Sequence, residues 1–128
     1  MFRVAVAEDH AELRTALRLL LGLSEDIEVV FEAENGLEVI GLVQQHRPDV
    51  LVMDIRMPLL NGLAAVKQIV GLSLPTRIIL ISSLEGPGVI QEAMAAGAHG
   101  FVHKADVVKL LRTAIETVYH GGRFFPEE

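Results

Sequence analysis

The chain has 128 residues, a length that favours one domain able to bury about two thirds of its unfolded surface. Its residues are 51% hydrophobic and 22% charged, which excludes a disordered chain, and its net charge of -6 disfavours tight binding of this segment to nucleic-acid phosphates. Cysteine is absent, no apolar run approaches the roughly 18 residues of a membrane span, and acidic residues come too early for a secretory signal, so we expect a cytoplasmic protein.

The N-terminal quarter of the chain predicts a strand, a helix and a second strand. The apolar run Phe2–Ala7 ends in Glu8 and Asp9, and leucines at helical spacing predict a helix over 10–23 with Asp9 as its N-cap. Apolar and acidic residues alternate over Ile27–Ala33, which is typical of an edge strand with one solvated face.

The same alternation continues to the end of the chain. The expected elements are, in order, a helix over 37–46, a strand over 49–54, a helix over 63–70, a strand over 77–81, a helix over 89–96, a strand over 101–104 and a helix over 106–120. Gly86-Pro87-Gly88 is expected to be a loop, and Gly97 to end the helix before it. Five strands alternating with five helices predict an α/β domain whose parallel sheet carries helices on both faces.

Polar residues stand where four of these strands end: Glu8 and Asp9, Asp54, Ser82, and Lys104. The carboxyl ends of parallel strands share one edge of a sheet, where open α/β sheets bind ligands. Two like charges ~4 Å apart repel by about 4 kcal/mol at an effective dielectric of 20, so converging carboxylates need a cation. Oxygen ligands suit Mg2+.

Each of these residues also has a purely structural interpretation. The two acids after the first strand favour the positive end of a helix, a lysine after a strand can simply reach solvent, and a serine there is ordinary. The five histidines match no zinc spacing and are interpreted as structural, at positions His10, His46, His99, His103 and His120. The specific signal therefore lies in the whole constellation.

Four segments together resemble the receiver domain of bacterial two-component response regulators: Glu8-Asp9-His10, residues 53–58 with Asn61-Gly62, Ile81-Ser82-Ser83, and residues 95–104. The resemblance spans the chain in the right order. It implies a flavodoxin-like, doubly wound (βα)5 fold with a five-stranded parallel sheet of order 2-1-3-4-5.

The resemblance also implies a function. A sensor histidine kinase would transfer a phosphoryl group to Asp54, and Mg2+ would be held by Glu8, Asp9, Asp54 and the backbone carbonyl of Arg56. Ser82 and Lys104 would contact the phosphoryl group, and Phe101 would rotate together with Ser82. Such a domain is a signalling switch, not an enzyme, because it catalyses only its own phosphotransfer and autodephosphorylation.

The end of the chain, residues 121–126, resembles the start of the linker in the subfamily with a LuxR-type helix-turn-helix output domain. We therefore expect a receiver domain over 1–121 and, over 122–128, the start of a linker to an output domain that this chain lacks. Phe124 and Phe125 are expected to be exposed. DNA would be bound only through the missing domain, and phosphorylation would expose that domain or pair two receivers.

This sequence departs from the family at three places: Glu8 stands where many relatives have Asp, Ala105 follows Lys104 where many have proline, and Gly86-Pro87-Gly88 follows Ser82. Among other classes, a haloacid dehalogenase needs a second Asp two residues after its nucleophile, where this chain has Arg56. A nucleotide-binding domain needs a glycine-rich phosphate loop that the sequence lacks. A receiver that binds partners without phosphorylation is a third alternative, although every required side chain is present.

Overall fold

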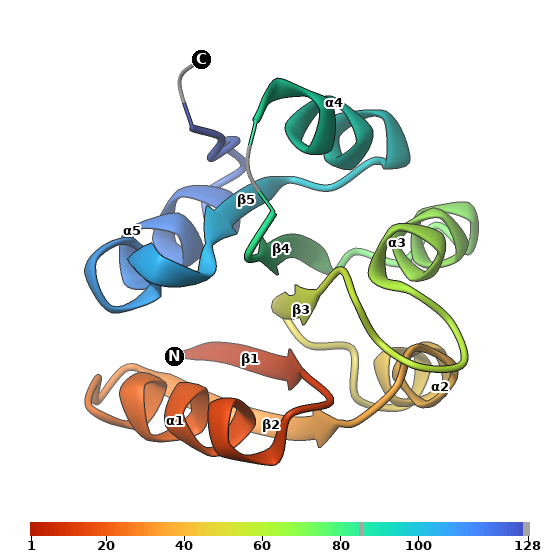
Figure 1. The fold of residues 1–128 in the computed structure, drawn as a ribbon. Helices are drawn as coiled ribbons and strands as arrows, with labels where there is room; N and C mark the ends of the chain where they lie inside the picture. Colours follow the sequence, from red (N-terminus) through yellow and green to blue (C-terminus); the bar gives the residue numbers. More distant parts are fainter. Residues whose placement is uncertain (85, 127–128) are drawn as a thin grey trace.

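The computed structural model describes residues 1–84 and 86–126 as one sheet with helices on both faces (Figure 1). The elements are β1 (Phe2–Ala7), α1 (Ala11–Gly22), β2 (Ile27–Ala33), α2 (Gly36–His46), β3 (Val50–Asp54), α3 (Gly62–Gly71), β4 (Arg77–Ser82), α4 (Pro87–Ala96), β5 (Gly100–His103), the 3-10 turn η1 (Lys104–Asp106) and α5 (Val107–Tyr119). The strands are all parallel in the order β2-β1-β3-β4-β5, which confirms the predicted fold.

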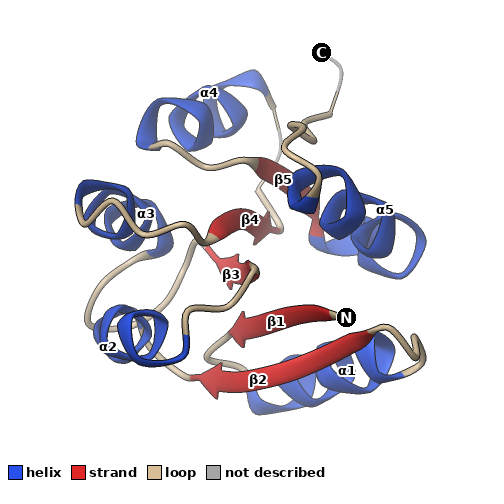
Figure 2. Cartoon of the chain, turned by 180° about the vertical axis from the view of Figure 1, so that it is seen from behind, coloured by secondary structure: helices blue, strands red, loops and turns tan. Residues whose placement is uncertain are grey.

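The sheet separates two hydrophobic cores. Helices α1 and α5 cover one face, and α2, α3 and α4 cover the other (Figure 2). Along β3, Val50 and Val52 point to the α1/α5 side, whereas Leu51 and Met53 point to the opposite side, as the twofold period of a strand requires. All four are completely buried, because a central parallel strand has no solvated face.

Most predicted bounds differ from the structure by about a residue; Lys104, for example, lies in η1 and not at the end of the strand. Two differences at helix starts have a clear physical reason. The N-cap of α1 is His10 and not Asp9, because Asp9 lies one residue too early and its side chain is at the sheet edge. Pro87 and Gly88 belong to the first turn of α4 and not to a loop, since proline at the start of a helix loses no intrahelical hydrogen bond. Gly97, with φ of 104°, ends α4 as predicted.

Two aromatic residues after α5 pack against the fold. Phe124 forms a parallel bridge with Gly100 of β5 and packs on the α1/α5 core, and Phe125 packs on the opposite core. The expectation that both aromatic side chains are exposed is therefore wrong, because sequence alone does not show that the edge of β5 is open to them. The division of the chain at residue 121 stays a prediction.

His99, directly before β5 at the amino ends of the strands, is a half-buried histidine that accepts a backbone hydrogen bond. His99 Nδ1 accepts a hydrogen bond of 3.0 Å from the backbone N–H of Ile78. Burial and the positive charges of Arg77 and Arg123 lower the pKa of His99, because all three oppose a charged imidazole.

Within the described residues, no helix is long and apolar enough to cross a membrane.

Candidate functional site

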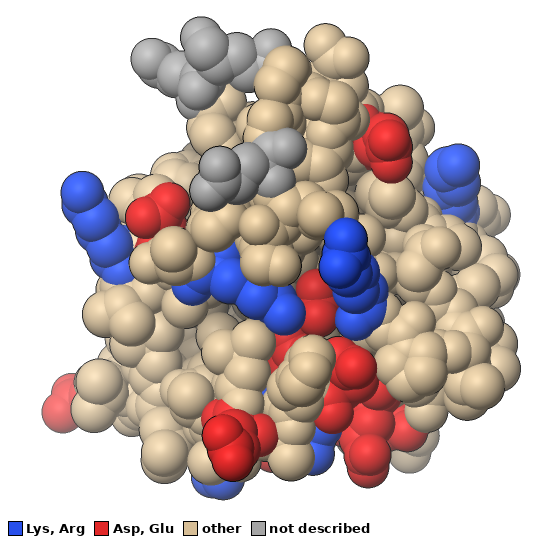
Figure 3. Space-filling view, viewed as in Figure 1, with Lys and Arg blue, Asp and Glu red and all other residues tan. Residues whose placement is uncertain are grey.

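The carboxyl edge of the sheet gathers the polar residues that end the strands. Glu8 directly follows β1, Asp54 ends β3, and Lys104 directly follows β5. The face shown in Figure 3 has acidic side chains clustered beside basic ones near its middle. Since β1 and β3 are neighbours in the sheet, the acids from these two strands meet without any long loop.

Four residues in this cluster offer possible metal ligands. One side-chain atom each of Glu8, Asp9, His10 and Asp54 can be chosen so that all four lie within 4.8 Å of one another. His10 Nδ1 is 3.2 Å from Glu8 Oε2 and 3.4 Å from Asp9 Oδ1. The sequence interpretation had grouped His10 with the other histidines, although its place directly after Glu8-Asp9 was a signal that it could reach the same site.

Lys104 bridges the two most deeply buried acids. Its Nζ donates a hydrogen bond of 2.9 Å to Asp54 Oδ2 and lies 3.2 Å from Glu8 Oε1. Partial burial lowers the pKa of Lys104, but the hydrogen bond and charge of Asp54, followed by those of Glu8, outweigh it, so the pKa of Lys104 is raised. The lysine is therefore held charged beside Asp54.

The pKa of Glu8 is raised by its surroundings. Its side chain is fully buried, and burial is the main reason that its pKa is raised. The hydrogen bond from the backbone N–H of His10 lowers this pKa, whereas Asp9 and the charge of Asp54 raise it further. The backbone carbonyl of Glu8 is fixed by Arg14, whose Nη1 donates to it over 2.8 Å.

Two carboxylate oxygens in this cluster are buried and have no hydrogen-bond partner among the described residues, namely Glu8 Oε1 and Asp9 Oδ1. Lys104 contacts the first of them as an ion pair at 3.2 Å, but without the alignment of a hydrogen bond. Buried polar atoms are normally paired, so these oxygens indicate an additional partner. A hard cation that prefers oxygen ligands, such as Mg2+, fits this donor set.

The phosphoacceptor candidate Asp54 has both oxygens oriented by the protein. Oδ2 accepts from Lys104, and Oδ1 accepts a hydrogen bond of 3.2 Å from the backbone N–H of Arg56, in the loop after β3. Gly62 packs so closely on this strand end that a Cβ there would collide with the Asp54 carbonyl oxygen. Its N–H donates to the Ile55 carbonyl over 2.7 Å, which fixes the start of α3 against the site.

Ser82 ends the neighbouring strand β4, one residue beyond Ile81, which pairs with Asp54. Its side chain is buried and Oγ accepts a hydrogen bond of 2.9 Å from the Leu84 N–H, which leaves the hydroxyl proton available to donate. Phe101 is buried in the core on the α2–α4 side. The structure thus brings Glu8, Asp9, Asp54 and Lys104 into contact and places Ser82 on the adjoining strand.

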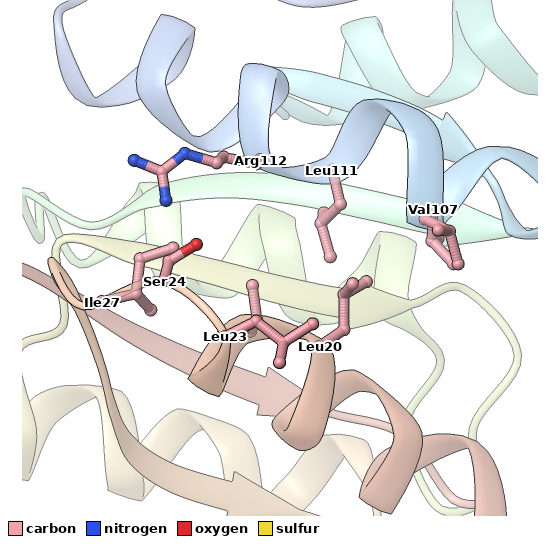
Figure 4. A pocket seen from close by; sticks show the side chains of 9 residues that line it. Leu20, Leu23, Ser24, Ile27, Val107, Leu111 and Arg112 are labelled. Carbon is pink, nitrogen blue, oxygen red and sulfur yellow. The ribbon is translucent and has the colours of Figure 1, made fainter.

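A groove between α1 and α5 is lined by residues of a different kind from those of the acidic cluster (Figure 4). Leucine, isoleucine and valine side chains make up most of its lining, together with Ser24 and Arg112. Arg112 is engaged at the rim, where Nη2 lies 2.8 Å from Asp26 Oδ2 and 3.0 Å from Glu116 Oε1. This apolar groove lacks the convergent acids of the sheet edge, which is therefore the candidate reactive site.

Comparison with known proteins gives a consistent result. The sequence model of the response regulator receiver domain matches residues 4–116. The uncharacterized transcriptional regulatory protein YvfU of Bacillus subtilis (strain 168) is 35% identical over 128 residues, which are 100% of this chain and 64% of that protein. The oxygen regulatory protein NreC of Staphylococcus carnosus (strain TM300) is 34% identical over 123 residues, which are 95% of this chain and 57% of NreC.

Solved structures resemble the chain equally closely. The signal receiver domain of the response regulator NarL from Mycobacterium tuberculosis superposes with a TM-score of 0.90 at 33% identity, covering 94% of this chain and 97% of that one. A LuxR-family two-component response regulator from Aurantimonas sp. SI85-9A1 has a TM-score of 0.92 at 30% identity, covering 97% and 89%. The chain spans about three fifths of the length of the two curated relatives.

Proposed function

Because the chain belongs to the response regulator receiver domain family, we propose that it accepts a phosphoryl group on Asp54 from a sensor histidine kinase. The observation that carries this proposal is the environment of Asp54. It is a buried carboxylate at the end of a wholly apolar strand, it faces a charged lysine 2.9 Å away, and two further acids lie beside it. Such a carboxylate can act as a nucleophile that is oriented before the donor arrives.

The proposed transfer forms one bond and breaks one. A carboxylate oxygen of Asp54 bonds to phosphorus, and the bond between phosphorus and the histidine nitrogen of the kinase breaks, with its electron pair staying on the nitrogen. We assign to Lys104, which contacts Asp54, and to the Ser82 hydroxyl on the adjoining strand the role of donating hydrogen bonds to phosphoryl oxygens, where negative charge accumulates.

The site has the residues to hold Mg2+, which would neutralise part of the phosphoryl charge when bound. We assign the metal to Glu8, Asp9, Asp54 and the backbone carbonyl of Arg56. Two of these side chains carry the buried oxygens without hydrogen-bond partners, and Arg56 follows Asp54 closely along the chain. His10 stands at the rim, with its imidazole Nδ1 3.2 Å from Glu8 Oε2 and 3.4 Å from Asp9 Oδ1.

The output of the switch is proposed to be transcriptional. The curated relatives are transcriptional or oxygen regulatory proteins that are longer than this chain, so residues 1–121 would be the receiver and 122–128 would lead to an output domain. We propose a cytoplasmic regulator that binds DNA through that domain, and in which phosphorylation pairs two receivers. Autodephosphorylation by water attack on the acyl phosphate would reset it.

Intact mass spectrometry after incubation with acetyl phosphate and Mg2+ tests the proposed chemistry. We expect the chain to gain one phosphoryl group, and Asp54→Asn to gain none. Asp49→Asn, in the residue directly before the same strand, is a matched control that should be phosphorylated like the natural chain. Phosphorylation that persists in Asp54→Asn, or that maps to Ser82 or Ser83, contradicts the assignment.

A further inference from the structure

The residues that follow α5 connect two elements of the fold. We name residues 122–125 the C-terminal strap. At its root, the Gly122 N–H donates a hydrogen bond of 2.9 Å to the Thr117 carbonyl of α5, and a Cβ on Gly122 would lie 2.9 Å from Thr117 Cγ2. The root is thus pressed against α5 and has little freedom to slide along it.

The other end of the C-terminal strap is bound to β5. The Phe101 N–H donates to the Phe124 carbonyl over 2.8 Å, and the Phe124 N–H donates to the His99 carbonyl over 3.0 Å. With these two bonds Phe124 forms an isolated parallel bridge to Gly100, where a Cβ would come within 3.1 Å of the Phe124 oxygen. In both ribbon views the segment lies beside β5, between α4 and α5 (Figures 1 and 2).

The two aromatic side chains of the strap pack on opposite faces of the sheet. Phe124 packs with the α1/α5 core and Phe125 with the core under α4, as the alternation of a strand demands. The Arg123 guanidinium lies 5.3 Å from the centre of the Phe125 ring, a distance at which the cation and the ring attract. Both aromatic side chains of the strap therefore pack against this edge of the sheet.

Strand β5 is also the strand that reaches the phosphoacceptor. Lys104 follows β5 directly and contacts Asp54, and the last residue of β5, His103, pairs with Ser82 in the sheet. Both residues that we assign to the phosphoryl group are thus joined to a strand of four residues. The other end of β5, at Gly100 and Phe101, carries the strap, so this strand is the direct path between Asp54 and the strap.

From this geometry we propose that the C-terminal strap is a phosphorylation-sensitive connection that loosens when Asp54 is phosphorylated, an inference that rests on the function proposed above. The two bonds to Phe124 are near their optimal lengths in the present arrangement, and hydrogen bonds weaken steeply with stretching or misalignment. Because the root is fixed on α5, the strap cannot follow β5, so a shift of β5 relative to α5 weakens these bonds. Release of the strap would change how any segment after it is held.

Amide hydrogen exchange measured by NMR on residues 1–128 tests this proposal, with beryllofluoride and Mg2+ as the phosphoryl mimic. We expect the Phe101 and Phe124 amides to exchange at least threefold faster with the mimic, while the Gly122 amide at the root and the amides of β1 keep their rates. Unchanged or slower exchange at Phe101 and Phe124, together with shifted signals around Asp54, overturns the strap and leaves the proposed function standing. If no signal around Asp54 shifts, the proposed function fails and the strap proposal fails with it.

A variant provides the reciprocal test. Coupling of two equilibria is mutual, so a strap that is already loose favours the phosphorylated arrangement. Phe124→Ala should therefore show fast Phe101 exchange without the mimic, and it should bind beryllofluoride at least twofold more tightly than the natural chain. Tyr119→Ala, which removes an aromatic residue that packs on Phe2 outside the strap, should bind it unchanged. Equal or weaker binding by Phe124→Ala contradicts the coupling.

Discussion

Replacing Lys104 by methionine tests how the acidic site is held together. The side chain keeps most of its apolar stem in this variant but loses the charge that lies 2.9 Å from Asp54 Oδ2 and 3.2 Å from Glu8 Oε1. Two buried carboxylates then face one another without their cation. We expect Lys104→Met to lower the free energy of unfolding at neutral pH in the absence of divalent metal.

The size of the loss follows from the two contacts. Opposite unit charges about 3 Å apart attract by about 5 kcal/mol at an effective dielectric of 20, before the cost of removing them from water is subtracted. Removing one partner of a buried pair typically costs about 3–5 kcal/mol. The Lys104 side chain is 21% exposed, so water screens part of its field, and we expect a loss of about 3 kcal/mol, at the lower end of that range.

Urea denaturation with and without millimolar Mg2+ measures both the loss and its cause. Mg2+ should stabilise Lys104→Met more than the natural chain, because the metal replaces the missing positive charge and no longer competes with the lysine. Lys109→Met, an exposed lysine of α5, is the matched control and should change stability by less than about 0.5 kcal/mol. The reasoning is refuted if Lys104→Met is as stable as the natural chain, or if Mg2+ stabilises both equally.

Three further predictions concern other parts of the fold. Gly62→Ala should lower stability in urea by more than about 2 kcal/mol, because its Cβ meets the backbone at the end of β3, whereas Gly41→Ala, with nothing within 4 Å, should gain about 0.5–1 kcal/mol. The pKa of His99 is lowered in the folded chain, so the stability that the neutral imidazole contributes is complete above about pH 6.5 and is lost as the pH falls through the folded pKa. His99→Asn should therefore show a smaller decline in melting temperature toward low pH than the natural chain. An equal decline in both contradicts this prediction. Arg112→Ala should leave the urea midpoint nearly unchanged, since its ion pairs are exposed and screened by water, and a clearly lower midpoint would show that the groove rim is structural.

Local patterns in the sequence were sufficient to predict the elements and their order. The strand Ile27–Ala33 agrees with its predicted bounds, because the alternation of apolar and polar residues along the chain directly predicts a strand with one buried face. The order of the strands followed from the resemblance to receiver domains and is confirmed by the sheet. The convergence of Glu8, Asp54 and Lys104 could also be predicted, since parallel strands necessarily end at a common edge.

The tertiary structure alone decided which partners these groups find. Lys104 bridges Asp54 and Glu8, His10 joins the acidic cluster, and Phe124 pairs with Gly100 of β5. Most of these contacts join residues far apart in the chain, and each requires its atoms to be placed to within about an ångström, which residue spacing does not encode. Side-chain reach and strand register settle them only when the whole sheet is assembled, because a hydrogen bond or ion pair is strong only over that short range.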